Sequence, residues 1–360
     1  MTTENETPPG QPLSGASSAE NLLAAHLAEQ AGRFLRALPD VDLGTLRRVD
    51  GALHAFGSLL EPIWAETMRG DLAALVVTLG QERGYSRRLA RLLAAVDSLT
   101  CTDTTVPTPR TGEAARGAEG GVATEHMVGG LLAHHPGAPK ARAMLERQLT
   151  LARSRSHTAA LQELGSSRFH SLADRMTLLV SDLPLRSPGT AHQPEQLLAY
   201  TARLGEALEL TVSRLPLQRA AQPYNGDALH RVAVVPAADS PAMAAHEDAA
   251  WTRVGAAVRY ARYALEVCRP LLGERTEEPL TGLAALAAHL ERQQEAADAA
   301  EAAALAARTP RITPATAYVL GVVHADQRLE VEAARHAFSV SWPAFHSSGW
   351  LTDPWLARST

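Results

Sequence analysis

Arg259 and Arg262 stand at helical spacing in the largely apolar stretch AAVRYARYALEVCRP, residues 256–270. At about 100° of rotation per residue, one helix face presents Arg259, Arg262, Tyr263 and Glu266. Guanidinium groups in such a row can donate to phosphate oxygens, because the planar fork matches that geometry. Glu266 follows Arg262 by four residues and can pair with it. Three interpretations stay open: a solvated face, an ion-pair network, or the wall of an anion site.

The composition predicts an all-α protein. Of 360 residues, 46% are hydrophobic but only 4% are aromatic, so the chain has enough apolar surface for a core and few residues that favour strands. The formal net charge of -5 argues against a general or sequence-specific nucleic-acid binder, which usually carries a strongly basic domain. Any anion site must therefore be local.

The sequence lacks the motifs that are typical of disulfides, metal sites and catalytic sites. Cys101 and Cys268 are far apart and predict neither a disulfide nor a zinc site. The histidines show no helical metal-ligand pair with a third ligand in view, so we expect no metal. The sequence has no nucleophile elbow, phosphate-binding loop or dinucleotide glycine motif. We therefore expect a protein that is not an enzyme and uses no cofactor.

The N-terminal residues are polar and contain no apolar signal core. No later run approaches the roughly 20 apolar residues of a membrane span. We therefore expect a cytoplasmic chain with no transmembrane segment.

Helical periodicity begins at Ala19 and is interrupted by two long breaks. The first break, 101–121, is rich in Thr, Gly and Pro, and the second, 216–246, contains HRVAVV, the only run that resembles a strand. Thr313 and Pro314 predict the start of the last helix. After a first helix that ends before Pro39, we expect helices at about 42–60, 63–82, 85–99, 138–164, 166–183, 194–214, 247–272, 279–308 and 313–338.

Five stretches resemble, in order, motifs of the CHAD family, the conserved histidine α-helical domain. RVGAAVRYARYALEV is similar to the family's signature helix, in which a His and several basic residues precede a Tyr and a Glu. LGTLRRVDGALHAFGSLLEP resembles its first basic helix, with paired arginines. The other three are LVVTLGQERGYSRRLARLL, RSRSHTAALQELGSSRFHSLADRM and HLERQQEAADAA. The resemblance covers roughly residues 20–345.

The resemblance implies two packed four-helix bundles of long antiparallel helices, related by an internal repeat, with basic helices facing a central cavity. It also implies binding of inorganic polyphosphate, since CHAD domains are known for this and occur beside polyphosphate enzymes or on polymer granules. We expect a disordered tail at 1–18, the helical domain at 19–345 and a C-terminal tail at 346–360. Within the domain, the bundles would span about 19–185 and 194–345. Trp350 in the C-terminal tail would dock on a partner or back on its own domain.

The sequence departs from the family pattern in both basic helices. In the first, the family's His and flanking arginines align with Asp40, Leu43 and Asp50, which leaves Arg47 on that stripe. In the second, the His aligns with Thr252 and the next Arg with Gly255. Asp40 and Asp50 would repel a polyanion. We therefore expect polyphosphate binding that is weaker than in the family.

The expected ligand is inorganic polyphosphate or another phosphate-rich polyanion. The alternative is a scaffold or granule-associated interaction protein that keeps the fold and has lost the ligand. The predicted binding residues are Arg47, Arg48, Arg259 and Arg262, with Arg83, Arg168, Arg253 and Tyr263 as contributors.

Overall fold

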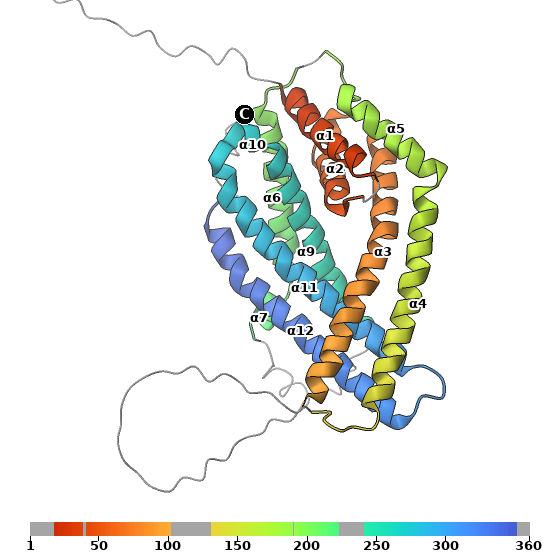
Figure 1. Cartoon of the computed structure of the whole chain (residues 1–360). Coiled ribbons are helices and arrows are strands. Elements are labelled where there is room, and N and C mark those ends of the chain that lie inside the picture. Colours follow the sequence, from red (N-terminus) through yellow and green to blue (C-terminus); the bar gives the residue numbers. More distant parts are fainter. Residues whose placement is uncertain (1–17, 39–40, 102–130, 190, 223–240, 351–360) are drawn as a thin grey trace, which may run out of the picture.

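The computed structural model describes residues 18–38, 41–101, 131–189, 191–222 and 241–350, with side chains in the last segment from 247. Over these residues the chain is built of helices, apart from one isolated bridge between Leu60 and Leu185 (Figure 1). The expected all-α class is confirmed. The run HRVAVV, Asp40, and the expected tails up to residue 17 and from residue 351 lie outside the described residues.

The longer helices follow the predicted order. They are α1 (Ala19–Arg36), α2 (Leu43–Ala55), α3 (Pro62–Thr100), α4 (Ala138–Leu164), α5 (Ser167–Ser181), α6 (Glu195–Ser213), α9 (Pro241–Val267), α11 (Glu277–Ala307) and α12 (Pro314–Ser347). Short pieces between them are η2 (Gly57–Leu59), α7 (Leu217–Ala220), α10 (Arg269–Leu272) and η3 (Gly273–Thr276).

Helix starts follow the capping residues. Asp42 accepts from the backbone N–H groups of Gly44 at 2.9 Å and Thr45 at 3.0 Å, which begins α2. The Thr313 side chain accepts from Thr316 N–H at 3.4 Å, so the predicted start of α12 is confirmed. Such caps satisfy N–H groups that have no partner inside the helix.

Several predicted helix ends are wrong. Helix α2 ends at Ala55 instead of about 60, and α9 begins at Pro241 instead of about 247. The expected break between 82 and 85 is absent, because α3 continues through Gly84 to Thr100. A helical glycine costs only about 1 kcal/mol relative to alanine, which packing of α3 along α4 can offset. Helix α12 also continues past 338 and through Pro343 to Ser347. The buried aromatic rings of Phe338, Trp342 and Phe345 hold this extension against the core.

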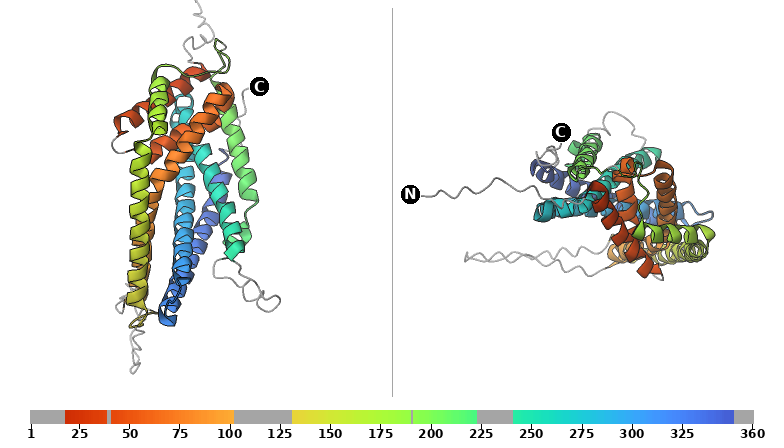
Figure 2. Two further views of the ribbon diagram at one scale, coloured as in Figure 1. Left: turned by 90° about the vertical axis from the view of Figure 1, so that its right-hand side faces the viewer. Right: turned by 90° about the horizontal axis from the view of Figure 1, so that it is seen from above.

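The long helices pack mainly as pairs. Helix α3 lies along α4, and α11 lies along α12 (Figures 1 and 2). The short helix α2 contacts α1, α3 and α9, so it lies where helices from the two ends of the chain meet. This position brings the first predicted basic helix against the second.

The buried apolar side chains form two main clusters. The larger includes Phe34, Leu53 and Phe56 from early helices together with Trp251 and Phe338 from late ones. The smaller lies where α3, α4, α11 and α12 meet, around Leu92 and Leu320. The larger core therefore joins both halves of the chain. The division into bundles at 19–185 and 194–345, and the internal repeat, stay predictions.

Trp350 docks on the chain's own domain. Its side chain is only 4% exposed, and its ring centroid lies 5.4 Å from that of Phe345. Within the described part of the chain, every helix is too short or too polar to be a membrane span.

Candidate anion-binding site

Helices α2 and α9 pack in opposite directions and bring predicted site residues together. The rings of His54 and Tyr260 stack with centroids 3.9 Å apart. At the other end of the contact, Arg48 meets Glu266. The two helices are therefore antiparallel. The start of α2, with Arg47 and Arg48, lies beside the C-terminal part of α9, with Arg262 and Glu266.

One carboxylate holds two of the predicted arginines. Arg48 Nε donates to Oε2 of Glu266 at 3.0 Å, and Arg262 Nε donates to Oε1 at 3.1 Å. Each guanidinium has five N–H donors, so each contact uses one of them. The Nη groups of both arginines have no hydrogen bond to any described carboxylate. Glu266 thus orients two guanidinium groups and leaves their outer edges as donors.

The three side chains are partly buried. Exposed fractions are 28% for the Arg48 side chain, 32% for Arg262 and 18% for Glu266. A charged hydrogen bond at such a site is stronger than at a fully solvated surface, because water screens it less. The geometry is therefore held in place while the outer guanidinium edges stay accessible.

Tyr263 forms the base of the cluster. It is 8% exposed, and burial raises the pKa of its phenol, against the opposing effect of Arg47, Arg48 and Arg262. The phenol is therefore neutral at pH 7. Arg47 is exposed, and its positive charge opposes the rise in the pKa of Tyr263. We call Arg47, Arg48, Arg262, Tyr263 and Glu266 the α2–α9 cluster.

Arg259 lies one turn before the α2–α9 cluster on α9. Its Nη1 is 3.5 Å from the position that a Cβ would take at Gly255, and Leu290 of α11 lies beside the same position. The resemblance to the family implied a basic residue at position 255. The glycine instead leaves room for the Arg259 side chain to lie along its own helix. No described carboxylate forms an ion pair with Arg259 or Arg47.

Asp50 is neutralised by a residue that the sequence analysis did not single out. Arg69 of α3 donates from Nε to Oδ1 of Asp50 at 3.0 Å. The predicted repulsion between Asp50 and a polyanion is therefore reduced. No local signal identifies Arg69 as the partner, because the pair depends on how α2 packs on α3.

His26 of α1 is a second residue that the sequence did not reveal. Burial lowers the pKa of its imidazole, and the nearby carboxylates of Glu266 and Glu29 oppose that shift. Its Nε2 is buried and has no hydrogen-bond partner among the described residues. A neutral imidazole thus lies near the carboxylate that organises the α2–α9 cluster.

The remaining predicted residues lie elsewhere or make other contacts. Arg168 pairs with Glu163, its Nη2 donating to Oε1 at 2.6 Å. Arg253 lines a separate pocket that shares no residue with the α2–α9 cluster. Arg83 is exposed on α3, and its part in the site stays a prediction. The structure thus brings together Arg47, Arg48, Arg262 and Tyr263, and assigns Arg168 and Arg253 to other surroundings.

The described residues contain no group of three or more His, Cys, Asp or Glu side chains placed to hold a metal ion. The chemistry of the α2–α9 cluster is that of hydrogen-bond donors and positive charge. Such a set is suited to an anion.

Known proteins resemble this chain in sequence and in fold. A family model described as "CHAD domain" matches residues 44–304, which include all of α2 except Leu43, and the basic part of α9. A solved structure, PptA from Streptomyces chartreusis, is 37% identical over 91% of this chain and all of that chain, with a TM-score of 0.68. The CHAD domain from the plant Ricinus communis is 19% identical, covering 89% of this chain and 92% of that chain, with a TM-score of 0.48. No curated protein matches the chain. The chain belongs to the CHAD family.

Proposed function

We propose that the chain binds inorganic polyphosphate or another phosphate-rich polyanion without catalysing a reaction. The ligand would lie across the α2–α9 cluster and Arg259. The main support for this proposal is that Arg48 and Arg262 share the carboxylate of Glu266. Glu266 uses both oxygens to orient Arg48 and Arg262 through Nε, and so leaves the Nη donors for phosphate.

The charges of the cluster favour an anion. The α2–α9 cluster and Arg259 together hold four guanidinium groups, and the carboxylates beside them are Glu266 and Asp42. Four positive charges against two negative ones leave the set net positive. Asp50 is engaged by Arg69. A polyanion gains from several such contacts at once, each about 1.5 to 3 kcal/mol before screening.

The helices reduce the entropic cost of binding. Arg48 and Arg262 are held by hydrogen bonds on helices packed against each other, so less side-chain freedom is lost when phosphate arrives. Replacement of family basic positions by Leu43, Thr252 and Gly255 leaves fewer donors. The affinity should therefore be lower than in family members that keep them. The proposed location is the cytoplasm.

A scaffold or granule-associated protein is the alternative, and one observation favours it. The ion pair between Arg48 and Glu266 joins α2 to α9 and would stabilise the fold even without a ligand. In that case Arg48 and Glu266 matter for stability, and polyphosphate does not bind.

Calorimetric titration with long-chain polyphosphate at several salt concentrations separates the two. The double variant Arg48→Ala with Arg262→Ala should lose about 10-fold to 100-fold in affinity and show a weaker salt dependence. In this double variant the Glu266 carboxylate has lost both arginine partners and repels phosphate. Adding Glu266→Gln removes that negative charge and should recover only part of the lost polyphosphate affinity. The matched control is Arg147→Ala with Arg275→Ala, which changes the net charge equally at exposed positions. Absence of binding at low salt, or an equal loss in the control, would contradict the proposal.

A further inference from the structure

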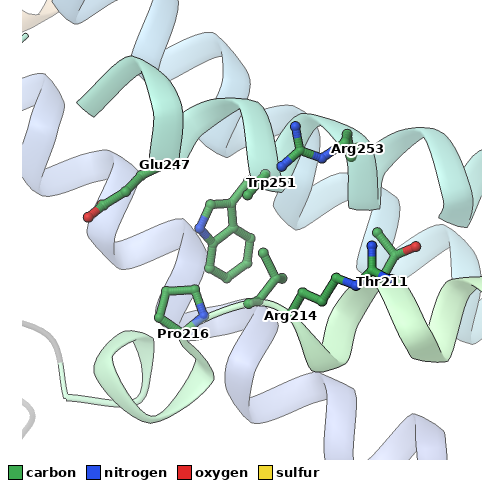
Figure 3. A pocket seen from close by; sticks show the side chains of 8 residues that line it. Thr211, Arg214, Pro216, Glu247, Trp251 and Arg253 are labelled. Atoms are coloured by element: carbon green, nitrogen blue, oxygen red, sulfur yellow. The ribbon is translucent and has the colours of Figure 1, made fainter. Parts of the chain in front are cut away.

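A separate pocket of about 520 Å³ lies where the end of α6 and the start of α7 face α9 (Figure 3). This volume is within the range of small-molecule sites, roughly 300 to 1,000 Å³. It shares no residue with the α2–α9 cluster. Arg253 of this pocket and Arg259 of the proposed polyanion site are six residues apart, so they point about 120° apart around α9.

Two arginines from different helices supply the charge of the pocket. Arg214 follows the last residue of α6, and Arg253 lies in α9. Figure 3 shows their side chains on opposite sides of the same space, near Thr211. Both are exposed, and neither forms an ion pair with a described carboxylate. The arginines are therefore available to an incoming anion.

The carboxylate of the pocket is already neutralised. Glu247 accepts from Arg219 Nη1 at 2.8 Å and from Arg335 Nη1 at 3.4 Å. In Figure 3 its carboxylate points away from Arg214 and Arg253. The arginine end of the pocket therefore keeps its positive charge.

Thr211 adds little donor capacity to that end. Its hydroxyl already donates to the backbone oxygen of Ala207 at 2.6 Å, within its own helix. The guanidinium groups of Arg214 and Arg253 are thus the main donors. A pair of guanidinium groups suits one phosphate or diphosphate group, because each can donate two parallel N–H bonds.

The rest of the lining is apolar and firmly held. Leu215, Pro216, Ala250 and the edge of Trp251 form this part. The Trp251 ring packs edge-on against Phe338 at 5.5 Å. These apolar side chains offer no favourable contact to a purely inorganic anion. They can bury an apolar group that is attached to a phosphate.

We propose that this pocket binds a small organic phosphate, in which a phosphate or diphosphate ester carries a compact apolar or aromatic body. The phosphate lies between Arg214 and Arg253, and the body lies against Leu215, Pro216 and the Trp251 edge. The proposal is independent of polyphosphate binding at the α2–α9 cluster.

The test is a calorimetric titration of the full chain with ADP, pyrophosphate and adenosine as probes. ADP should bind at least 10-fold more tightly than pyrophosphate or adenosine. The variant Arg214→Ala with Arg253→Ala should lose at least 10-fold in ADP affinity. Arg147→Ala with Arg275→Ala, the control of equal charge, should keep it.

Variants of the α2–α9 cluster separate this site from the first. Arg48→Ala with Arg262→Ala should leave ADP binding unchanged, while Arg214→Ala with Arg253→Ala should leave polyphosphate binding unchanged. Three results would overturn the proposal: no saturable ADP binding, ADP binding that survives loss of Arg214 and Arg253, or pyrophosphate that binds as tightly as ADP. The last result would show that the apolar wall contributes nothing.

Discussion

Gly51 of α2 lies directly against the ring of Tyr263 of α9. A Cβ placed on Gly51 would be 2.5 Å from Cδ2 and 2.8 Å from Cβ of the tyrosine. No real Cβ tolerates such distances, so the absence of a side chain at position 51 sets how closely the two helices approach. That approach is what lets Arg48 reach Glu266 across the interface.

Replacing Gly51 with alanine should therefore destabilise the fold. Overpacking at a buried contact costs about 1 to 3 kcal/mol, and the gain in helix propensity from Gly to Ala offsets up to about 1 kcal/mol of it. Urea unfolding should show a net loss of about 1 to 2 kcal/mol in the free energy of unfolding. Gly70 of α3 is the matched control, since a Cβ there meets nothing within 4 Å. Gly70→Ala should be neutral or stabilising, and equal effects at both positions would contradict the packing argument.

The pair between Asp50 and Arg69 should protect polyphosphate binding. Arg69→Ala leaves the Asp50 carboxylate uncompensated, one helical turn from Arg47. Polyphosphate affinity at low salt should fall by about threefold to tenfold, a Coulomb effect on the order of 1 kcal/mol. Adding Asp50→Ala to Arg69→Ala should restore most of it. If the double variant binds no better than Arg69→Ala, Asp50 does not act through its charge.

Stability should depend on pH through His26. Burial lowers the pKa of this imidazole below its ordinary value of 6.5 in the folded state. Below pH 6.5 the unfolded chain therefore binds a proton that the folded chain does not, and the free energy of unfolding falls as the pH falls. Chemical unfolding of His26→Gln between pH 7.5 and pH 5 tests this.

The His26→Gln variant should lose stability less steeply with falling pH than the unmodified chain. His54 and His289, whose pKa values burial also lowers, contribute to the part that remains. His170→Gln, at an exposed position of α5, is the control and should keep the full pH dependence. An unchanged slope in His26→Gln would show that His26 does not contribute.

The two cysteines should differ sharply in reactivity. Cys268 is fully buried, and burial raises the pKa of its thiol to about 12, against a hydrogen bond with Thr201. Since the thiolate is the reactive form, Cys268 should be inert at pH 8, whereas Cys101 is exposed. A thiol reagent such as DTNB should modify one cysteine in the folded chain and two after denaturation. Rapid reaction of both in the folded chain would contradict the burial of Cys268.

Local signals predicted the helices but misplaced several of their ends. Asp42 and Thr313 mark helix starts because each side chain caps N–H groups only two or three residues away. The sequence also predicted helix ends at about 82 and 338, whereas α3 continues through Gly84 and α12 through Pro343. The structure overrides them, because packing along α4 and the buried Trp342 and Phe345 contribute more than the local penalties cost.

The sequence by itself determined the all-α class, the order of the helices and the stripe of Arg259, Arg262 and Glu266, because each depends on neighbours within a few positions. Only the tertiary structure decided which guanidinium groups share a carboxylate. Arg48 and Glu266 are separated by 218 positions, and Arg69 reaches Asp50 only because α2 packs on α3. It also decided that Arg253 lines a pocket away from the α2–α9 cluster that holds Arg262, although the two share one helix. Long-range contacts of this kind follow from packing of the whole core, which no local pattern of residues encodes.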